Sequence, residues 1–412
     1  MKTIHGQGNN RAIREVNRSI ILDLVRRGGH ISRTELARRS KLTKPTVSTI
    51  IEQLIKDGVV NEVGLGESLS GGGRPARLLE FNDASAAFLG IHFAVGSTVV
   101  ALADARGVIR QVRTKPMAKE SPAKAVKALR PLLTEVLQAA KISRGRLEAA
   151  CAVLPGLVDQ ESGVCTLAPN LGWRDFPLRD ALVDELHVPV SVNNITQASA
   201  VAEGRVGVAR GMRSYVWLYV GSGVGAGIVL DGRLFFGQRG FSGEIGHCPV
   251  AEDGPICGCG RRGCLETVTS TMALDRMVKQ ALSSKAKSIL SKTDGVIDVA
   301  AVVGAAQAGD AVASGILADI GEHLGRGISY LLNILNPEMI VLGGAMADAG
   351  ETLLRVVRGS VARHALLPHG VAIVPSTLGD KAEITGAVLL ALERTARSYR
   401  IVGSPGHDLP TT

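Results

Sequence analysis

Three cysteines within eight residues, Cys257, Cys259 and Cys264, constrain the fold of this 412-residue chain more than any other feature. Together with His247 they offer three thiolates and one imidazole, the closed tetrahedral donor set of a structural Zn²⁺ site. The glycines around the cysteines allow the tight backbone that brings the sulfurs onto one ion. Cys248 is an alternative fourth ligand, and free buried or redox-active cysteines are the alternative to any metal. The spacing predicts structural zinc without an open coordination position for catalysis.

The size of the chain suits two or three domains, and a hydrophobic content of 45% is ample for sizeable cores. No apolar run reaches the roughly 18 residues of a membrane-spanning helix. The N-terminal MKTIHGQGNN lacks the apolar region of a signal peptide. We therefore expect a cytoplasmic protein without a membrane partner.

Positive charge is concentrated near the N-terminus. Residues 1–80 contain 14 Lys and Arg against 8 Asp and Glu, a net charge of +6. Residues 81–412 contain 33 against 30, and so contribute only +3 of the total of +9. A small basic module suits the phosphates of nucleic acid, although a solvated basic surface explains the charge alone equally well.

The same eighty residues carry the signals of short helices. Apolar residues recur at helical spacing from Ile13 to Val25, and this segment stops at Gly28. Ser32 and Glu35 form a capping box, in which each side chain is expected to satisfy the backbone amide of the other. The box predicts the start of a second helix.

A third helix is predicted after the turn KLT, with Thr43 as its N-cap. Apolar residues share one face of this helix, and small polar residues face the other way. A short helix, a tight turn and a second helix with a polar outer face are typical of a helix-turn-helix, whose second helix enters the major groove of DNA. The side chains expected to contact DNA here are Lys44, Thr46, Ser48, Thr49 and Gln53.

The stretch GVVNEVG…GGGRPARLLEFN has the pattern of a hairpin that would form a wing, with Arg74 and Arg77 placed to meet phosphate or the minor groove. A small helical domain that binds protein is the alternative. Helices, wing and charge together predict a winged helix-turn-helix over residues 1–80, with a double-stranded DNA operator as its partner.

Beyond residue 81 the pattern changes to buried strands that alternate with helices, which predicts α/β layers. The helical segments include AKAVKALRPLLTEVLQAA and SGILADIGEHLGRGISYLLNIL. The strand candidates are FLGIHFAVGSTVVALAD, LEAACAVLPGLVD, VPVSVNN, SYVWLYVGSGVGAGIVLDG and PEMIVLGGAM.

The motifs GEIGH and CxCGxxGCLE, at this spacing, resemble those of the ROK family of repressors, open reading frames and sugar kinases. The stretches GGGRPARLLEFN, GSGVGAG and IVLGG also match, and they identify the regulator branch with an N-terminal winged helix. The resemblance implies an α/β, actin-like (ribonuclease-H-like), two-lobed sugar-kinase fold. The first lobe would span 81–193, with the C-terminal helix 382–396 returning to it. The second lobe, 194–381, would carry the zinc site and a dimerisation surface.

The resemblance also implies a sugar in the cleft: a hexose, a pentose or an N-acetylhexosamine. His247 would both ligate zinc and face the sugar, because zinc on one ring nitrogen orients the other. The alternative for the two glutamates, Glu244 and Glu266, is that their carboxylates are solvated or salt-bridged. The implied sugar partners are Asn170, Asn194, Glu244, His247 and Glu266.

Two departures from the kinase pattern bear on catalysis. The family's DxGGT-type phosphate loop is replaced by the stretch from His92 to Gly96. The aspartate that would take the proton from the sugar hydroxyl corresponds to Ile195, or to Asn194 if the register shifts by one. Neither register supplies a carboxylate, so no catalytic residue is assigned.

These features predict a sugar-responsive, kinase-inactive DNA-binding transcriptional regulator of carbohydrate metabolism, in the simplest case a repressor. A homodimer or a dimer of dimers would read two operator half-sites. The alternatives are an ATP-dependent sugar kinase with an appended DNA-binding domain, and a regulator whose sugar-kinase fold senses a partner protein.

Overall fold

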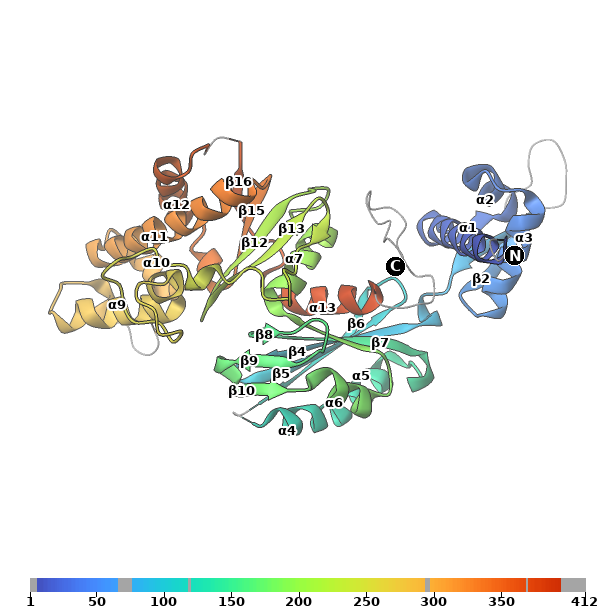
Figure 1. Ribbon diagram of the computed structural model, residues 1–412, viewed down its shortest axis with the longest axis horizontal. Coiled ribbons are helices and arrows are strands. Elements are labelled where there is room, and N and C mark those ends of the chain that lie inside the picture. The colour runs from blue at the N-terminus through green and yellow to red at the C-terminus, as the bar shows by residue number, and fades with distance from the viewer. Residues whose placement is uncertain (1–5, 66–75, 118–119, 293–296, 368–369, 394–412) are drawn as a thin grey trace, which may run out of the picture. The chain divides into compact units, whose positions relative to one another are not determined.

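The computed structural model describes residues 6–65, 76–117, 120–292, 297–367 and 370–393 (Figure 1). The chain forms two compact units. The first comprises Met1–Leu154, Pro169–Val192 and Ala387–Thr412, and the second comprises Pro155–Ala168 and Asn193–Gly386. The winged helix therefore belongs to the first unit, and the segment 155–168, expected in the first lobe, belongs to the second. The three-part division at 80/81 and 193/194 stays a prediction.

The N-terminal module has the order of elements that the sequence predicts for a winged helix. Its three short strands form one sheet in the order β1-β3-β2, and the loop 66–75, which contains Arg74, lies outside the described residues. The elements are α1 (Gly6–Gly28), β1 (Ile31–Ser32), α2 (Arg33–Ser40), α3 (Lys44–Lys56), β2 (Val60–Leu65) and β3 (Arg77–Phe81).

Both predicted N-caps are confirmed. The amide of Glu35 donates to Ser32 Oγ at 3.2 Å, and the amide of Thr46 donates to Thr43 Oγ1 at 3.4 Å. The reciprocal half of the capping box is not among the hydrogen bonds of the described residues. The Glu35 carboxylate instead accepts from Arg38 and Arg39, one turn further on, because these guanidinium groups are stronger donors than a backbone amide.

The sheet of the first unit has the order β11-β7-β4-β5-β6. The apolar stretch 88–104 is not one strand. It is an antiparallel hairpin that turns at Val95-Gly96, where Gly96 adopts a φ of 84°. Strand β4 also pairs in parallel with β7. The strands are β4 (Ala87–Ala94), β5 (Ser97–Asp104), β6 (Ile109–Pro116), β7 (Leu147–Leu154) and β11 (Val190–Asn194).

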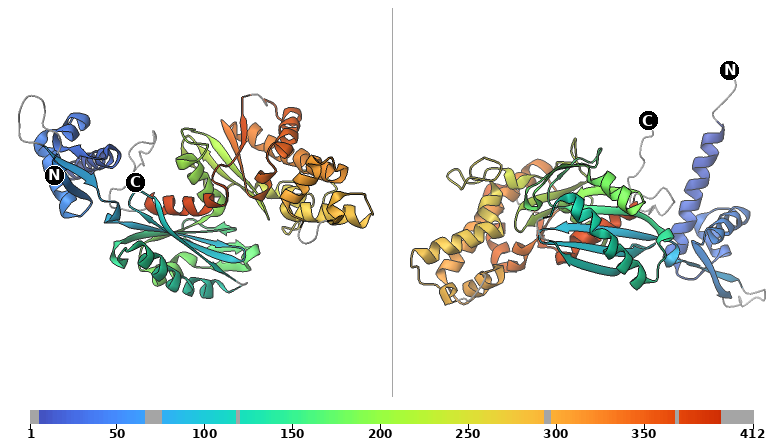
Figure 2. Two further views of the ribbon diagram at one scale, coloured as in Figure 1. Left: turned by 180° about the vertical axis from the view of Figure 1, so that it is seen from behind. Right: turned by 90° about the horizontal axis from the view of Figure 1, so that it is seen from below.

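Helices α4 (Pro122–Lys127), α5 (Leu129–Ala140) and α6 (Leu178–Leu186) lie on one face of this sheet (Figure 2). The predicted single helix over 123–140 is interrupted between α4 and α5. Pro131 explains the break, because it has no amide hydrogen to donate to the carbonyl of Lys127.

The second unit contains a sheet of order β14-β13-β12-β15-β16. Apolar residues of β12 alternate between its faces: Val216, Leu218 and Val220 join the core beneath the helices, and Tyr215 and Trp217 face α7. The strands are β12 (Tyr215–Val220), β13 (Val224–Leu230), β14 (Arg233–Leu234), β15 (Met339–Gly343) and β16 (Ala372–Pro375).

Helix α7 covers one face of this sheet and α8–α12 cover the other (Figure 1). The short strands β8 (Leu157–Val158) and β9 (Cys165–Ala168) pair antiparallel in the same unit. The helices are α7 (Ile195–Val206), α8 (Leu265–Thr269), α9 (Thr271–Ser283), α10 (Val299–Gln307), α11 (Ala311–Leu335) and α12 (Gly350–His364). Helix α13 (Ala382–Glu393) begins in the second unit and belongs to the first from Ala387 onward.

Among the helices that the structure describes, none is by itself long and apolar enough to cross a membrane. Helices α10 and α11 meet that test only as a pair, and they are bent by 119° at the break between them.

Candidate metal centre, ligand site and DNA-binding face

Helix α3 presents a polar face to solvent. Lys44, Thr49 and Gln53 are exposed, and Thr46 and Ser48 are half-buried. The Thr46 hydroxyl hydrogen-bonds the hydroxyl of the cap residue Thr43, at 2.9 Å. Gln53 Nε2 donates to Asp57 Oδ1 at 2.7 Å. Among the described residues Lys44 and Thr49 have no such partner, so they are the α3 side chains best placed to contact a duplex.

The wing carries its own ion pairs. Arg77 donates to Glu62 across the hairpin at 2.6 Å, and Arg33 reaches the same carboxylate at 2.9 Å. The hydrogen bond from Arg77 holds the pKa of Glu62 below its ordinary value. Arg77 is nevertheless largely exposed, with 61% of its side-chain surface accessible. The guanidinium predicted to meet phosphate is thus oriented by a partner and still open to solvent.

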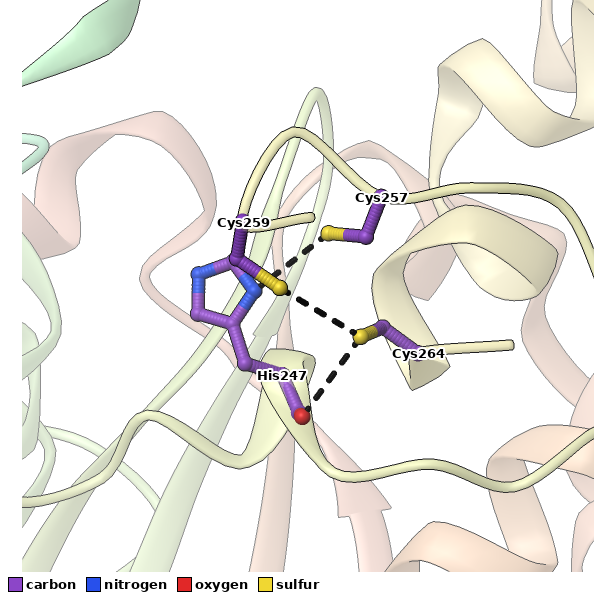
Figure 3. Close-up of side chains that lie close together, drawn as sticks. All are labelled: His247, Cys257, Cys259 and Cys264. Atoms are coloured by element: carbon purple, nitrogen blue, oxygen red, sulfur yellow. Dashed lines mark hydrogen bonds between the residues drawn. The ribbon is translucent and has the colours of Figure 1, made fainter. Parts of the chain in front are cut away.

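The four predicted metal ligands converge in the second unit (Figure 3). Their nitrogen and sulfur atoms all lie within 4.8 Å of one another. His247 Nδ1 is 3.5 Å from Cys257 Sγ, and the sulfurs of Cys259 and Cys264 are 3.7 Å apart. Tetrahedral zinc with Zn–S bonds of about 2.3 Å has edges of roughly 3.8 Å between sulfurs and about 3.6 Å from sulfur to nitrogen. The cluster therefore has the donors and the spacing to hold a metal ion.

The surroundings shift the pKa values of two of the cluster's thiols in opposite directions. The backbone amide of Arg261 lowers the pKa of Cys259 to about 7. Burial, followed by the neighbouring cysteines, raises the pKa of Cys264 to about 12. Three thiolates this close cannot coexist unless positive charge compensates them, and a coordinated divalent ion deprotonates a thiol outright.

Glycine and backbone hydrogen bonds shape the loop that carries these cysteines. Gly263 has a φ of 67°, and a Cβ there would overlap the carbonyl oxygen of Ala251. The amide of Cys257 donates to the carbonyl of Arg261 at 2.7 Å, which closes the turn. Cys248 lies outside the metal-binding group, and its side chain packs against the apolar core. The alternative in which Cys248 is the fourth ligand is therefore disfavoured.

The two predicted sugar-facing glutamates lie beside the metal cluster. Because Nδ1 of His247 faces the sulfurs, its Nε2 is left on the other side, 3.9 Å from Glu244 Oε2. Glu266 accepts a hydrogen bond from the amide of Val224 at 3.1 Å, in the glycine loop between β12 and β13. Burial and the nearby Glu266 raise the pKa of Glu244, and His247 opposes the shift. Two carboxylates and a ring nitrogen lie here as groups that can hydrogen-bond hydroxyls.

Asn194 serves the fold as the N-cap of α7. Its Oδ1 accepts from the amide of Thr196 at 2.7 Å, and its Nδ2 donates to the carbonyl of Gly156 at 2.8 Å. Ile195, at the position expected for the catalytic base, is buried, with 7% of its surface exposed. In the shifted register the cap residue Asn194 takes the position of the base, and Asn193 before it is buried and accepts from Gln160. The N-terminus of α7 thus holds no carboxylate in either register.

The remaining predicted positions lie in the first unit. Asn170 is exposed in a short 3₁₀ turn, Pro169–Leu171. His92, in the stretch that replaces the phosphate loop, lies near the end of β4, and burial lowers its pKa to about 4. The structure does not bring Asn170 and His92 into the same unit as Glu244, His247 and Glu266.

Sequence reasoning missed Tyr219, at the end of β12. Its ring lies against two backbone turns that glycines keep open: a Cβ on Gly221 would overlap the ring, and a Cβ on Gly344 would come within 2.9 Å of it. The ring also stacks on Trp217, with 6.0 Å between centroids. Tyr219 therefore occupies space between the two glycine turns. The signal that could have found it is an aromatic residue two positions before the glycine of GSG.

The glycine loop itself has a packing role. A Cβ on Gly227 would overlap the carbonyl of Thr196 and approach Ala200, and a Cβ on Gly225 would lie 3.3 Å from Thr196. These glycines let β13 approach α7 closely. This contact gives the glycines a packing role that does not depend on a nucleotide phosphate.

Comparison with known proteins agrees with both modules. The ROK family model matches residues 88–394, and a model of winged helix-turn-helix DNA-binding domains matches residues 17–61. The chain is 31% identical to the xylose repressor of Caldicellulosiruptor bescii over 391 residues, 93% of this chain and 97% of that protein.

Solved structures show the same architecture. A ROK family transcriptional regulator, a homologue of the Escherichia coli MLC protein, superposes with a TM-score of 0.79 at 29% identity, over 92% of this chain and 96% of its own. A ROK glucokinase from Streptomyces griseus, in complex with glucose and AMPPNP, superposes with a TM-score of 0.64 at 28% identity. It covers 74% of this chain and 99% of its own. The predicted sugar-kinase-like α/β fold is confirmed, and the chain belongs to the ROK family, as a member with an N-terminal winged helix-turn-helix.

Proposed function

We propose that this protein is a sugar-responsive DNA-binding transcriptional regulator of carbohydrate metabolism, in the simplest case a repressor. The observation that carries the proposal is the union of two modules in one chain, a winged helix followed by a ROK fold. The similarity to a xylose repressor runs through both. A protein of this kind would act in the cytoplasm, where its operator lies.

On the DNA side, Lys44, Thr49 and Gln53 on α3 would enter the major groove, with Thr46 and Ser48 at their flanks. Arg77 on the wing would contact phosphate or the minor groove, as would Arg74 in the loop. Two copies of the chain, or two pairs, would place two winged helices on half-sites related by two-fold symmetry.

On the ligand side, Glu244, Glu266 and Nε2 of His247 would bind the hydroxyls of a hexose, a pentose or an N-acetylhexosamine. Asn170 and Asn194 would complete the site, with Asn194 acting from its place at the start of α7. A structural Zn²⁺ held by His247, Cys257, Cys259 and Cys264 would fix the imidazole ring and brace this wall. Bound sugar would change operator affinity only if it binds the two arrangements of the protein differently.

The chain would not transfer phosphate. The buried side chain of Ile195 has no proton acceptor for a sugar hydroxyl. The stretch His92–Gly96 lacks the aspartate and the glycine pair of the phosphate loop. Tyr219 fills the space between the glycine turns at Gly221 and Gly344, where a nucleotide phosphate would need the backbone.

A sugar kinase with an appended DNA-binding domain is the second candidate, because the superposition with a glucokinase extends over most of the ROK fold. The two candidates are separated by an ATP-coupled phosphorylation assay with D-xylose, D-glucose and N-acetylglucosamine. We expect no turnover above background, and turnover with any of these sugars would support the kinase.

A further inference from the structure

One side chain from the sheet of the first unit binds the winged helix directly. Arg106 lies in the turn between β5 and β6, and its Nη1 donates to the carbonyl of Arg26 at 2.7 Å. Arg26 lies in the last turn of α1, where carbonyl groups have no partner within the helix and a cation is favourable. The Arg106 Nε donates to Asp83, and the guanidinium lies over the ring of Phe81, 5.3 Å from its centroid.

The backbone of Arg106 is held firmly by the sheet. Asp104, only 2% exposed, accepts from the amides of Arg106 at 2.8 Å and Val108 at 3.0 Å, and from Arg110 Nε at 2.6 Å. A buried carboxylate with three donors leaves this turn little freedom. A movement of the turn would therefore be passed to the side chain of Arg106.

On the other side, α1 is tied to the DNA-reading helix. Arg18 of α1 pairs with Asp57, directly after α3, at 2.8 Å. The second oxygen of Asp57 accepts from Gln53, on the exposed face of α3. The link thus runs from Arg106 to the end of α1, along the helix to Arg18, and through Asp57 to Gln53.

In the sheet, the turn of Arg106 lies at one end of β5, and the turn Val95-Gly96 lies at the other. Strand β5 pairs with β4 from Ser97 to Asp104 without interruption. The stretch His92–Gly96 at that far end is the one that matches the family's phosphate loop. A paired strand is a stiff connection between the two turns.

We propose that Arg106 is the positioning residue that joins the winged helix to the sugar-kinase-like fold, and that it couples ligand occupancy to operator binding. The inference rests on the proposed function. Arg106 itself touches neither DNA nor ligand in this account. It acts by fixing the C-terminal end of α1 to a turn that the sheet controls.

Arg110, in β6 beside the turn, offers a control. Its side chain reaches Asp83, the side-chain partner of Arg106, and also Asp104, which binds Arg106 only through its backbone amide. No contact from Arg110 to α1 is among the hydrogen bonds and ion pairs of the described residues. Arg106→Ala removes the link to α1, whereas Arg110→Ala removes a similar charge from the turn and leaves that link in place.

The test compares the wild-type protein, R106A, R106K and R110A. Operator Kd is measured by fluorescence anisotropy on a duplex that the wild-type protein selects from a random library. Each titration is done with and without D-xylose, D-glucose or N-acetylglucosamine. Sugar Kd and Tm are measured in parallel, because a purely structural role would change these as well.

We expect the ratio of operator Kd with and without sugar to fall at least about fivefold in R106A relative to the wild-type protein. Sugar Kd should stay within about twofold, since the altered residue does not contact sugar. R110A should keep the wild-type ratio. R106K should recover the ratio only in part, because an ammonium group lacks the planar fork that bridges Asp83 and Arg26. R106K also serves as the test variant if R106A lowers Tm too far for the titration.

An unchanged ratio in R106A, or in R106K where R106A does not fold, beside a wild-type protein that responds to sugar, would overturn this inference and leave the proposed function standing. Equal loss of response in R110A would overturn it as well, because the effect would then belong to the charge of the turn. A wild-type protein whose operator Kd responds to none of the sugars would overturn both.

Discussion

Two stretches of the second unit differ in how far their residues match the pattern of the ROK family. The loop from Glu244 to Glu266 keeps the cysteines, the histidine and both glutamates at the expected spacing, and the structure brings them together. The start of α7 keeps its backbone and its asparagine cap, but a buried Ile195 replaces the carboxylate. The proposed ligand-binding groups and the position expected for the proton acceptor lie on different elements, so a change in one need not disturb the other.

Tyr219 strengthens this contrast. The glycine turns at Gly221 and Gly344 are still present, yet the ring between them takes the space that their small size would leave open. Glycine was therefore retained for packing, as Gly227 shows against α7. A glycine-rich loop in a sequence does not by itself indicate a nucleotide.

The largest effect should come from removing one ligand of the metal cluster in the stretch from Glu244 to Glu266. Cys264→Ser removes a buried ligand from a four-residue metal cluster, and structural zinc sites contribute folding free energy directly. We expect loss of bound metal and a fall in the free energy of unfolding of roughly 3 kcal/mol or more. Metal content by mass spectrometry and Tm by calorimetry measure the two effects.

Cys248→Ser is the control for this substitution, because Cys248 is a neighbour outside the cluster. It should retain metal and lose little stability. Metal loss in Cys248→Ser but not in Cys264→Ser would show that the ligand set is wrong.

The start of α7 can be tested by placing a carboxylate at the position where the kinase pattern has one. In Ile195→Asp a charge is placed at a buried position, and we expect the free energy of unfolding to fall by about 1–3 kcal/mol, with helix N-terminal electrostatics offsetting part of the burial cost. No ATP-dependent sugar phosphorylation should appear, because Tyr219 and the altered phosphate loop remain. Ile195→Val controls for volume. Measurable turnover in Ile195→Asp would mean that a single side chain separates this chain from a kinase.

Ligand binding should depend on the retained carboxylates. Glu244→Gln replaces a charged acceptor with a neutral one, and hydrogen bonds to charged groups contribute about 1.5–3 kcal/mol. We expect sugar Kd, measured by calorimetry, to rise at least about tenfold. Glu252→Gln, an exposed acidic position in the same loop, should leave sugar Kd unchanged. Similar values for both variants would remove Glu244 from the site.

The smallest effect concerns His92 in the replaced phosphate loop. Because the folded-state pKa of about 4 lies below the ordinary value of 6.5, the unfolded chain takes up the proton first on acidification. The stability that His92 contributes is therefore full above pH 6.5 and is lost as the pH falls towards 4. At pH 5.5 the wild-type protein should lose about 1 kcal/mol relative to pH 7.5 that His92→Asn retains. Urea unfolding at both pH values measures this, and parallel pH dependence of the two proteins would contradict it.

The sequence predicted well whatever depends on local spacing. The caps at Ser32 and Thr43 and the cysteine cluster were recognisable because each signal lies within a few residues or a known motif. Competing local contacts and contacts distant in sequence decided the rest. Glu35 turned to Arg38 and Arg39, and the stretch 88–104 folded back on itself at Gly96. Residues such as Tyr219 and Arg106 have meaning only through partners far along the chain.

A small sugar should change the affinity of this protein for its operator. Fluorescence anisotropy titrations of the selected duplex, with and without D-xylose, D-glucose and N-acetylglucosamine, measure this effect. We expect at least one sugar to shift the operator Kd by about tenfold. An operator Kd that none of these sugars changes, at concentrations up to tens of millimolar, would contradict it.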